Sequence, residues 1–149
     1  MKRRDVLAAG AGLAMLALVR PASATPEEMA AAIAAFTGGV APKEGKVRFD
    51  VAQLIDNGNA VPVTVAVDSA MSAADHVSAI GIFNERNPQT DVAVLTLGPR
   101  AGKAEVSTRI RLATSQRLVA VARMSDGSCW SKSVDVIVTL AACIEGEAP

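Results

Sequence analysis

A period-2 alternation of apolar and polar residues constrains the fold of this chain more than any other feature. It starts near Val47 and is clearest at residues 61–67, whose four valines would share one face of a strand. Similar stretches recur to the end of the chain, with turn signals between them. The predicted strands are 47–51, 61–67, 77–83, 92–97, 106–112, 118–122 and 130–140. About seven short strands without helices between them predict an all-β, Ig-like antiparallel β-sandwich, where Ig-like describes the architecture alone.

A short helix is predicted before the strands, over residues 25–38. Thr25 can cap it, Pro26 suits its first turn, and Glu28 completes a capping box. Gly38 and the glycine after it would end the helix. Its apolar residues lie at helical spacing and would dock on the sandwich: Met29, Ile33 and Phe36.

Residues 1–24 have the composition of a signal peptide. A charged start with paired Arg3 and Arg4 precedes an apolar run over residues 6–19, and Ala22-Ser23-Ala24 follows as an A-x-A cleavage site. The run is about 14 residues long, which is too short to span a bilayer. The arginine pair resembles a twin-arginine signal, so we expect export, by that route rather than the Sec route.

Charge and motif content exclude several classes of function. Removing the leader leaves eleven basic and fourteen acidic residues in 25–149, and this net negative charge argues against nucleic acid as a partner. No other apolar run is long enough for a membrane span. His76 is the only histidine, so no zinc site is expected. With no Ser-His-Asp order, catalytic carboxylate pair, phosphate loop or CxxC motif, we expect neither an enzyme nor a cofactor.

Two cysteines, Cys129 and Cys143, fall in the mature chain. If both lay along one extended strand, they would be roughly 45 Å apart, whereas a disulfide needs Cα atoms within about 7 Å. Either the last strand bends back, or Cys143 is free. Cys143 stands six residues before the end, so it is either a small apolar residue that closes the last strand or an accessible thiol at the tip of a short arm.

Four other side chains attract attention. Trp130 is predicted to anchor the core. Arg109 and Arg111 would share one face of a strand, and we interpret them as a solvated face rather than an anion site, with a partner interface as a further alternative. Cys129 is interpreted as a packing residue beside Trp130, with an intermolecular disulfide as the lesser alternative.

Several stretches, in order, resemble the SoxY family, the Y subunit of the periplasmic sulfur-oxidation carrier. They are residues 39–47, 56–63, 67–69, 82–88, 107–112 and 124–128. The resemblance implies an Ig-like sandwich over 39–140 and a carrier arm over 141–149. It implies that a C-terminal cysteine, here Cys143, carries thiosulfate-derived sulfur covalently, with no cofactor. It also implies a heterodimer with the β-sandwich subunit SoxZ, and transient contacts with the SoxAX cytochrome, SoxB and, where present, SoxCD.

The arm departs from the family pattern. It reads Ala141-Ala142-Cys143-Ile144-Glu145 in place of Gly-Gly-Cys-Gly-Gly. Ile144 is bulky and β-branched, and the carboxylates of Glu145 and Glu147 disfavour the thiolate form of a nearby cysteine. The alternative to a carrier is therefore a non-catalytic Ig-like heterodimerisation or binding module derived from one. A redox enzyme is the third reading, which the missing ligands and base disfavour.

Overall fold

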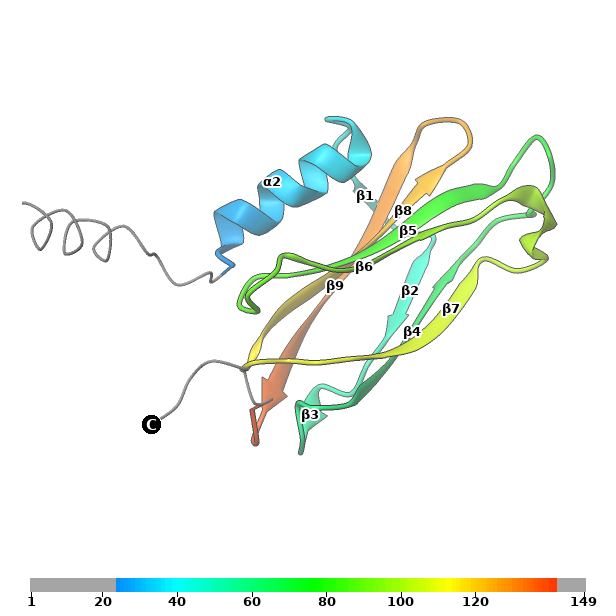
Figure 1. Cartoon of the computed structure of the whole chain (residues 1–149). Coiled ribbons are helices and arrows are strands. Elements are labelled where there is room, and N and C mark those ends of the chain that lie inside the picture. Colours follow the sequence, from blue (N-terminus) through cyan, green and yellow to red (C-terminus); the bar gives the residue numbers. More distant parts are fainter. Residues whose placement is uncertain (1–23, 142–149) are drawn as a thin grey trace, which may run out of the picture.

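Two β-sheets face one another, and the helix α2 covers the outer side of the larger sheet (Figure 1). The computed structural model describes residues 24–141 of the 149. The larger sheet has the strand order β1 (Lys43–Glu44), β9 (Cys129–Val138), β8 (Gln116–Met124), β5 (Val77–Asn84) and β6 (Asp91–Thr96), and β3 (Leu54–Ile55) also pairs with β9. The smaller sheet has the order β2 (Val47–Asp50), β4 (Val61–Val67) and β7 (Glu105–Ile110).

All seven predicted strands are present, and the pairs among them are antiparallel, so the predicted sandwich is confirmed. The structure adds β1 and β3, which pair with β9 in the parallel direction. Each has only two residues, and two residues show no alternation for a sequence pattern to detect. The last strand also ends at Val138, two residues before the predicted boundary.

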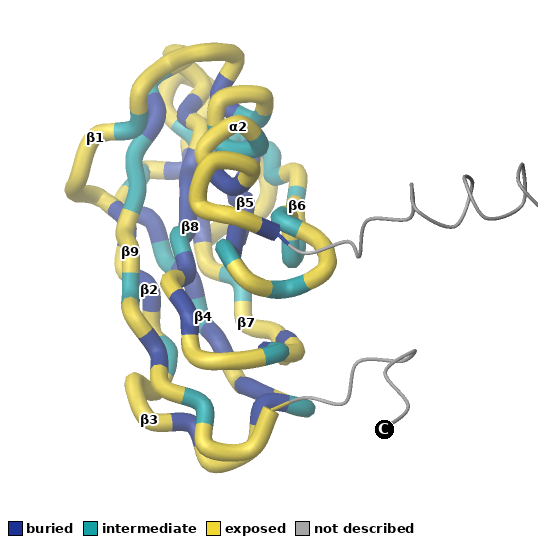
Figure 2. The backbone as a smooth tube through the Cα atoms, turned by 90° about the vertical axis from the view of Figure 1, so that its left-hand side faces the viewer, coloured by how far each residue is buried: buried dark blue, intermediate teal, exposed yellow. Residues whose placement is uncertain are grey.

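The core follows from the alternation. The four valines of β4 are 0–7% exposed, and the residues between them are partly or fully exposed. In contrast, β5 is buried on both faces, because one face packs on the smaller sheet and the other lies under the helix. Figure 2 shows this difference as dark central strands behind the mostly exposed helix.

The helix α2 spans Pro26–Thr37 and begins with the predicted capping box. The Glu28 backbone N–H donates to Thr25 Oγ1 at 3.1 Å, and the Thr25 N–H donates to Glu28 Oε2 at 3.0 Å. The helix ends at Gly38, whose φ of 66° is left-handed. Phe36 meets Phe83 of β5 edge to face at 5.5 Å between ring centres, and this contact fixes the helix on the sheet. A short 3₁₀ turn, η1 (Pro99–Ala101), joins β6 to β7.

Trp130 differs from the prediction. It packs against the core but stays partly exposed at the edge of the sandwich. Lys46 Nζ lies 5.1 Å and Lys43 Nζ 6.0 Å from its ring centre, and its Nε1 donates to Ser128 Oγ at 3.2 Å. The reason is its position: Trp130 is the second residue of β9 and pairs with Lys43 of β1, the strand that ends the sheet, and Lys46 follows in the next turn.

The predicted leader, apart from Ala24, lies outside the described residues. Ala24 is buried, and its N–H donates to the carbonyl of Asn87 at 2.9 Å. No helix within residues 24–141 has the length and apolar character needed to cross a membrane.

Candidate functional site

Cys143, the predicted attachment residue, lies outside the described residues. The structure does show the end of the sandwich from which the chain leaves towards it. Here the arm root denotes Thr139 and Leu140, which follow β9. Cys143 is the third residue after Leu140, so their Cα atoms lie within about 11 Å of each other. Within its own chain, the Cys143 thiol can therefore reach only the residues that surround the arm root.

The arm root is held by hydrogen bonds to β3 and the turn after it. The Thr139 N–H donates to the Ile55 carbonyl at 2.9 Å, and Thr139 Oγ1 donates to the carbonyls of Ile55 at 3.3 Å and Asp56 at 3.1 Å. The Gly58 N–H donates to the Leu140 carbonyl at 2.8 Å. These hydrogen bonds give the two-residue strand β3 a structural role. Together with the turn after β3, it holds the chain in place beyond the end of β9 at Val138.

Gly58 also connects the arm root to the β7–β8 loop. Its carbonyl accepts the Leu112 N–H at 2.8 Å, while Ser115 Oγ in the same loop accepts the Val138 N–H at 2.9 Å. The turn that carries Gly58 is closed by Asn57 Oδ1, which accepts the N–H of Asn59 at 2.9 Å. The turn signal of residues 56–59 therefore serves to bring three segments together at one end of the sandwich.

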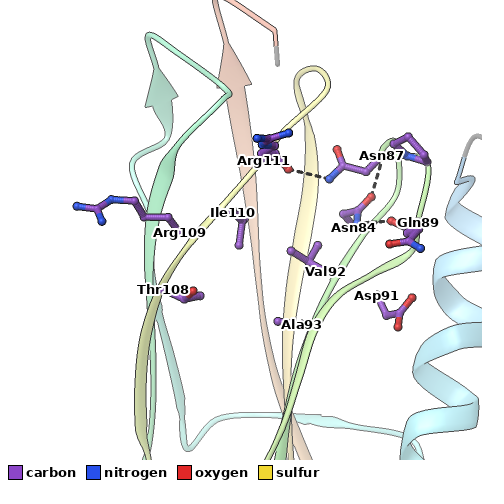
Figure 3. Close-up of a pocket in the computed structure, with 11 residues that line it drawn as sticks. Asn84, Asn87, Gln89, Asp91, Val92, Ala93, Thr108, Arg109, Ile110 and Arg111 are labelled. Atoms are coloured by element: carbon purple, nitrogen blue, oxygen red, sulfur yellow. Dashed lines mark hydrogen bonds between the residues drawn. The ribbon is translucent and has the colours of Figure 1, made fainter. Parts of the chain in front are cut away.

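Two asparagines lock the neighbouring β5–β6 loop. Asn84 is fully buried; its Nδ2 donates to the carbonyls of Gln89 at 2.7 Å and Thr90 at 3.3 Å, and its Oδ1 accepts the Asn87 N–H at 2.8 Å. Asn87 Nδ2 in turn donates to the Arg111 carbonyl at 2.8 Å (Figure 3). Asn87 Oδ1 accepts from Gln116 Nε2 at 2.9 Å and from the Ala113 N–H at 3.0 Å. The network ties the loop after β5 to the loop after β7.

A groove of about 640 Å³ opens between β6 and β7 at this end of the molecule (Figure 3). Val92, Ala93 and Ile110 give it an apolar wall, and Asn87 and Arg111 lie at its loop end. Arg109 belongs to the lining but points away from the groove. Both arginines are exposed, as predicted, but β7 ends at Ile110, so Arg111 lies just past the strand on which the two were expected to share one face.

Cys129 lies at the opposite end of β9 and is a free thiol with 1% exposure. Its Sγ is 3.9 Å from the Gly127 carbonyl oxygen, and burial raises the pKa of the thiol. The packing role predicted for it is confirmed. The ten residues of β9 place Cys129 roughly 30 Å from Val138, and the five residues from Val138 to Cys143 span at most about 18 Å. An intrachain disulfide between the cysteines is therefore excluded.

The remaining predicted features are structural. His76 Nδ1 is 3.1 Å from the Ser72 carbonyl oxygen. Within residues 24–141 no three His, Cys, Asp or Glu side chains are grouped so that they could hold a metal ion. Sequence reasoning missed the roles of Asn84, Asn87 and Gln116, although the first two lie in a stretch that carried the family resemblance. It also missed three exposed apolar residues near the arm root: Leu54, Ile137 and Leu140, which are 60–61% exposed.

The comparisons with known proteins agree with this architecture. The structure of the sulfur carrier protein SoxY from Chlorobium limicola f thiosulfatophilum matches with a TM-score of 0.65 and 31% identity, over 78% of this chain and 100% of that one. A superoxide reductase (neelaredoxin) variant from Ignicoccus hospitalis matches with a TM-score of 0.57 and 15% identity, over 76% of this chain and 92% of its own. A putative superoxide reductase from Thermotoga maritima gives 0.57 and 16%, over 66% and 93%. At such identities, the reductases share the fold alone.

A search of curated protein sequences found no match. The model of the family "Sulfur oxidation protein SoxY" matches residues 33–143, which include the last five residues of α2, the strands β1 to β9 and the predicted attachment cysteine. This match covers most of the chain and agrees with the independent structural match to a SoxY protein. The chain belongs to the SoxY family of sulfur-oxidation proteins.

Proposed function

We propose that this protein is a carrier of sulfur oxidation, which holds sulfur intermediates covalently on Cys143. One observation carries the proposal: the family match runs up to residue 143, and a solved member of that family is a sulfur carrier protein. The anchored arm root supports it, because it fixes the start of the arm at one end of a rigid sandwich. The thiol is then presented to other proteins rather than to a catalytic site of its own.

The chemistry of such a carrier needs an accessible thiol and external enzymes. Joining thiosulfate to the thiol forms a sulfur–sulfur bond, releases one proton and transfers two electrons to an oxidant, the role proposed for the SoxAX cytochrome. Hydrolysis by SoxB then breaks the bond to the terminal sulfone, releases sulfate and leaves a persulfide on Cys143. SoxCD, where present, oxidises that remaining sulfur. This chain contributes the attachment atom and its placement.

Partners and location are part of the same proposal. The leader-like residues 1–24 support export to the periplasm by the twin-arginine route. A SoxZ-like β-sandwich subunit is the proposed heterodimer partner. The exposed apolar residues Leu54 and Ile137, which pair in register on β3 and β9, support the presence of an interaction surface close to the arm.

The test is a mass measurement on the mature chain, residues 25–149. Incubation with thiosulfate, a SoxZ-like partner and a SoxAX-type cytochrome is expected to add the mass of a thiosulfate-derived adduct to the peptide that contains Cys143. Cys129→Ser is the matched control and is expected to accept the adduct, because Cys129 is buried. An adduct that persists in Cys143→Ser would refute the carrier assignment.

A second function is favoured by one feature, the replacement of arm glycines by Ile144 and Glu145. Under it, the chain keeps the sandwich and its binding surface but no longer carries sulfur. The same incubation separates the two: a binding module forms the complex with its partner and gains no adduct.

A further inference from the structure

The groove between β6 and β7 has the features of a binding site. It lies between the outermost strands of the two sheets, because β6 ends the larger sheet and β7 ends the smaller one. Val92 and Ala93 of its wall are only partly buried, so apolar surface remains open to a ligand. The Asn84–Asn87 network fixes the loop at one end of the groove, so the site is preformed.

The electrostatics at that end favour an acidic ligand. Arg111 is exposed and belongs to the lining, whereas Arg109 points away from the groove and Arg86 is not part of the lining. Among residues 24–141 the structure has one ion pair, Arg117 with Asp135, so Arg111 has no carboxylate partner there. Arg111 lies at the loop end of the groove (Figure 3), and Asp91 is the carboxylate in the lining.

The end of this chain has the complementary chemistry. Residues 144–149 read Ile-Glu-Gly-Glu-Ala-Pro, with one large apolar side chain, two carboxylates and the terminal carboxylate. The path is short. Gly58 hydrogen-bonds Leu140 on one side and Leu112, the neighbour of Arg111, on the other, which places the arm root roughly 10 Å from Leu112 at ordinary spacing between paired chains. Ile144 is four residues after Leu140 and can lie up to about 14 Å from it, and the five residues after Ile144 can extend about 17 Å further.

We propose that residues 144–149 bind in the β6–β7 groove of their own chain, with Ile144 against Val92 and Ile110 and the acidic side chains beside Arg111. Binding holds Cys143 against the domain, and release frees it for partner proteins. The other exposed apolar surface near the arm root, Leu54 with Ile137, fits this segment less well. Its neighbours include Asp56 and the already paired Asp135, which do not attract carboxylates. The proposal does not depend on Cys143 carrying sulfur.

Methyl NMR of the mature chain tests occupancy of the groove. Truncation after Cys143 is expected to shift the methyl signals of Val92 and Ile110 and to leave those of Val65, in the core of β4, unchanged. Arg111→Glu is expected to give the truncated-chain positions, and adding Glu145→Lys and Glu147→Lys to it is expected to restore the original ones. Arg48→Glu, an exposed arginine on β2 outside the groove, is the matched control and should change nothing. Identical Val92 and Ile110 signals in the full and truncated chains would overturn the proposal.

The rate of Cys143 alkylation, measured from the mass of the Cys143 peptide, gives a second readout. The direction in which Arg111→Glu changes this rate distinguishes docking of the segment from a direct effect of the Arg111 charge on the thiol. If the segment is docked, Arg111→Glu releases it and raises the rate roughly three- to tenfold, the range for losing screened ion pairs and the burial of one aliphatic side chain. If Arg111 acts only through its charge on the thiol, its reversal disfavours the thiolate and lowers the rate. A lower or unchanged rate contradicts docking. Adduct formation with thiosulfate is scored separately, so failure of one proposal is distinguishable from failure of the other.

Discussion

At the scale of single residues, the two cysteines have opposite environments. Cys129 is buried at the start of β9, where it is 1% exposed, and it lies in register with Arg123 of β8. Burial raises the pKa of its thiol and outweighs the nearby Arg123, which acts in the lowering direction. A buried, protonated thiol is a poor nucleophile, so reactivity in this chain is left to Cys143.

The raised pKa of Cys129 predicts a pH dependence of stability. Below the ordinary thiol pKa of 9.0, the folded and unfolded states both keep the proton, and the contribution is fully present. As the pH rises from there through the higher folded pKa, the unfolded state loses its proton first and stability falls. We expect the urea midpoint of the wild-type chain to drop more between pH 8 and pH 10 than that of Cys129→Ala. Equal drops in both proteins would contradict a raised pKa in the folded state.

Asn84 gives a second prediction at this scale. Asn84→Ala removes one acceptor and two donor contacts at a fully buried site and takes the side-chain donor from the Gln89 carbonyl, while the Thr90 carbonyl keeps the Asn84 backbone N–H. The free energy of unfolding should fall by about 2–4 kcal/mol, given the cost of buried unpaired polar groups. Chemical denaturation measures it, with Gln89→Ala as the control, because the Gln89 side chain is exposed and only its backbone takes part. A similar loss in both variants would show that the side-chain network is not the cause.

At the scale of elements, local signals were readable from the sequence and non-local ones were not. The capping box of α2 and the one-sided valines of β4 depend on spacing within a few residues, so the alternation and the Thr25–Glu28 pair predicted them. The pairing of β3 with β9 joins residues that are far apart in the chain and has no periodic signature. The same limit applies to Trp130, whose ring lies under Lys43 of β1 and the nearby Lys46 rather than in the core. The asparagine network depends on the approach of two loops, so its residues could be recognised as a family stretch but not assigned roles.

The contact between α2 and the larger sheet depends on one small residue. A Cβ at Gly81 would lie 2.6 and 2.8 Å from ring atoms of Phe83 and 3.4 Å from one of Phe36. Gly81→Ala should therefore displace the aromatic pair and destabilise the protein by about 1–3 kcal/mol, the usual cost of overpacking. Thermal unfolding measures the loss. Gly98→Ala is the matched control, since its Cβ would meet no atom within 4 Å and its backbone is extended. A stability equal to that of the control would show that the ring pair yields without cost.

At the scale of the whole molecule, β9 sets the distance between the two thiols. It runs from the end that holds Trp130 to the end that holds β3 (Figure 1). The hydrogen bonds of Thr139 and Leu140 hold the chain in place for two residues beyond the end of β9. The proposed attachment residue at one end is thereby separated from the buried thiol at the other. If the chain is exported as proposed, its two cysteines avoid the pairing that an oxidising compartment usually produces.

This separation predicts the product of oxidation. Treatment of the mature chain with diamide, which takes up two electrons and two protons for each disulfide formed, should join two chains through Cys143 and form no intrachain bond, because the arm cannot span β9. Non-reducing electrophoresis is expected to show a dimer for the wild type and for Cys129→Ser, and a monomer for Cys143→Ser. A monomer with one internal disulfide would mean that β9 does not extend as described, and the presentation of Cys143 at the β3 end would fall with it.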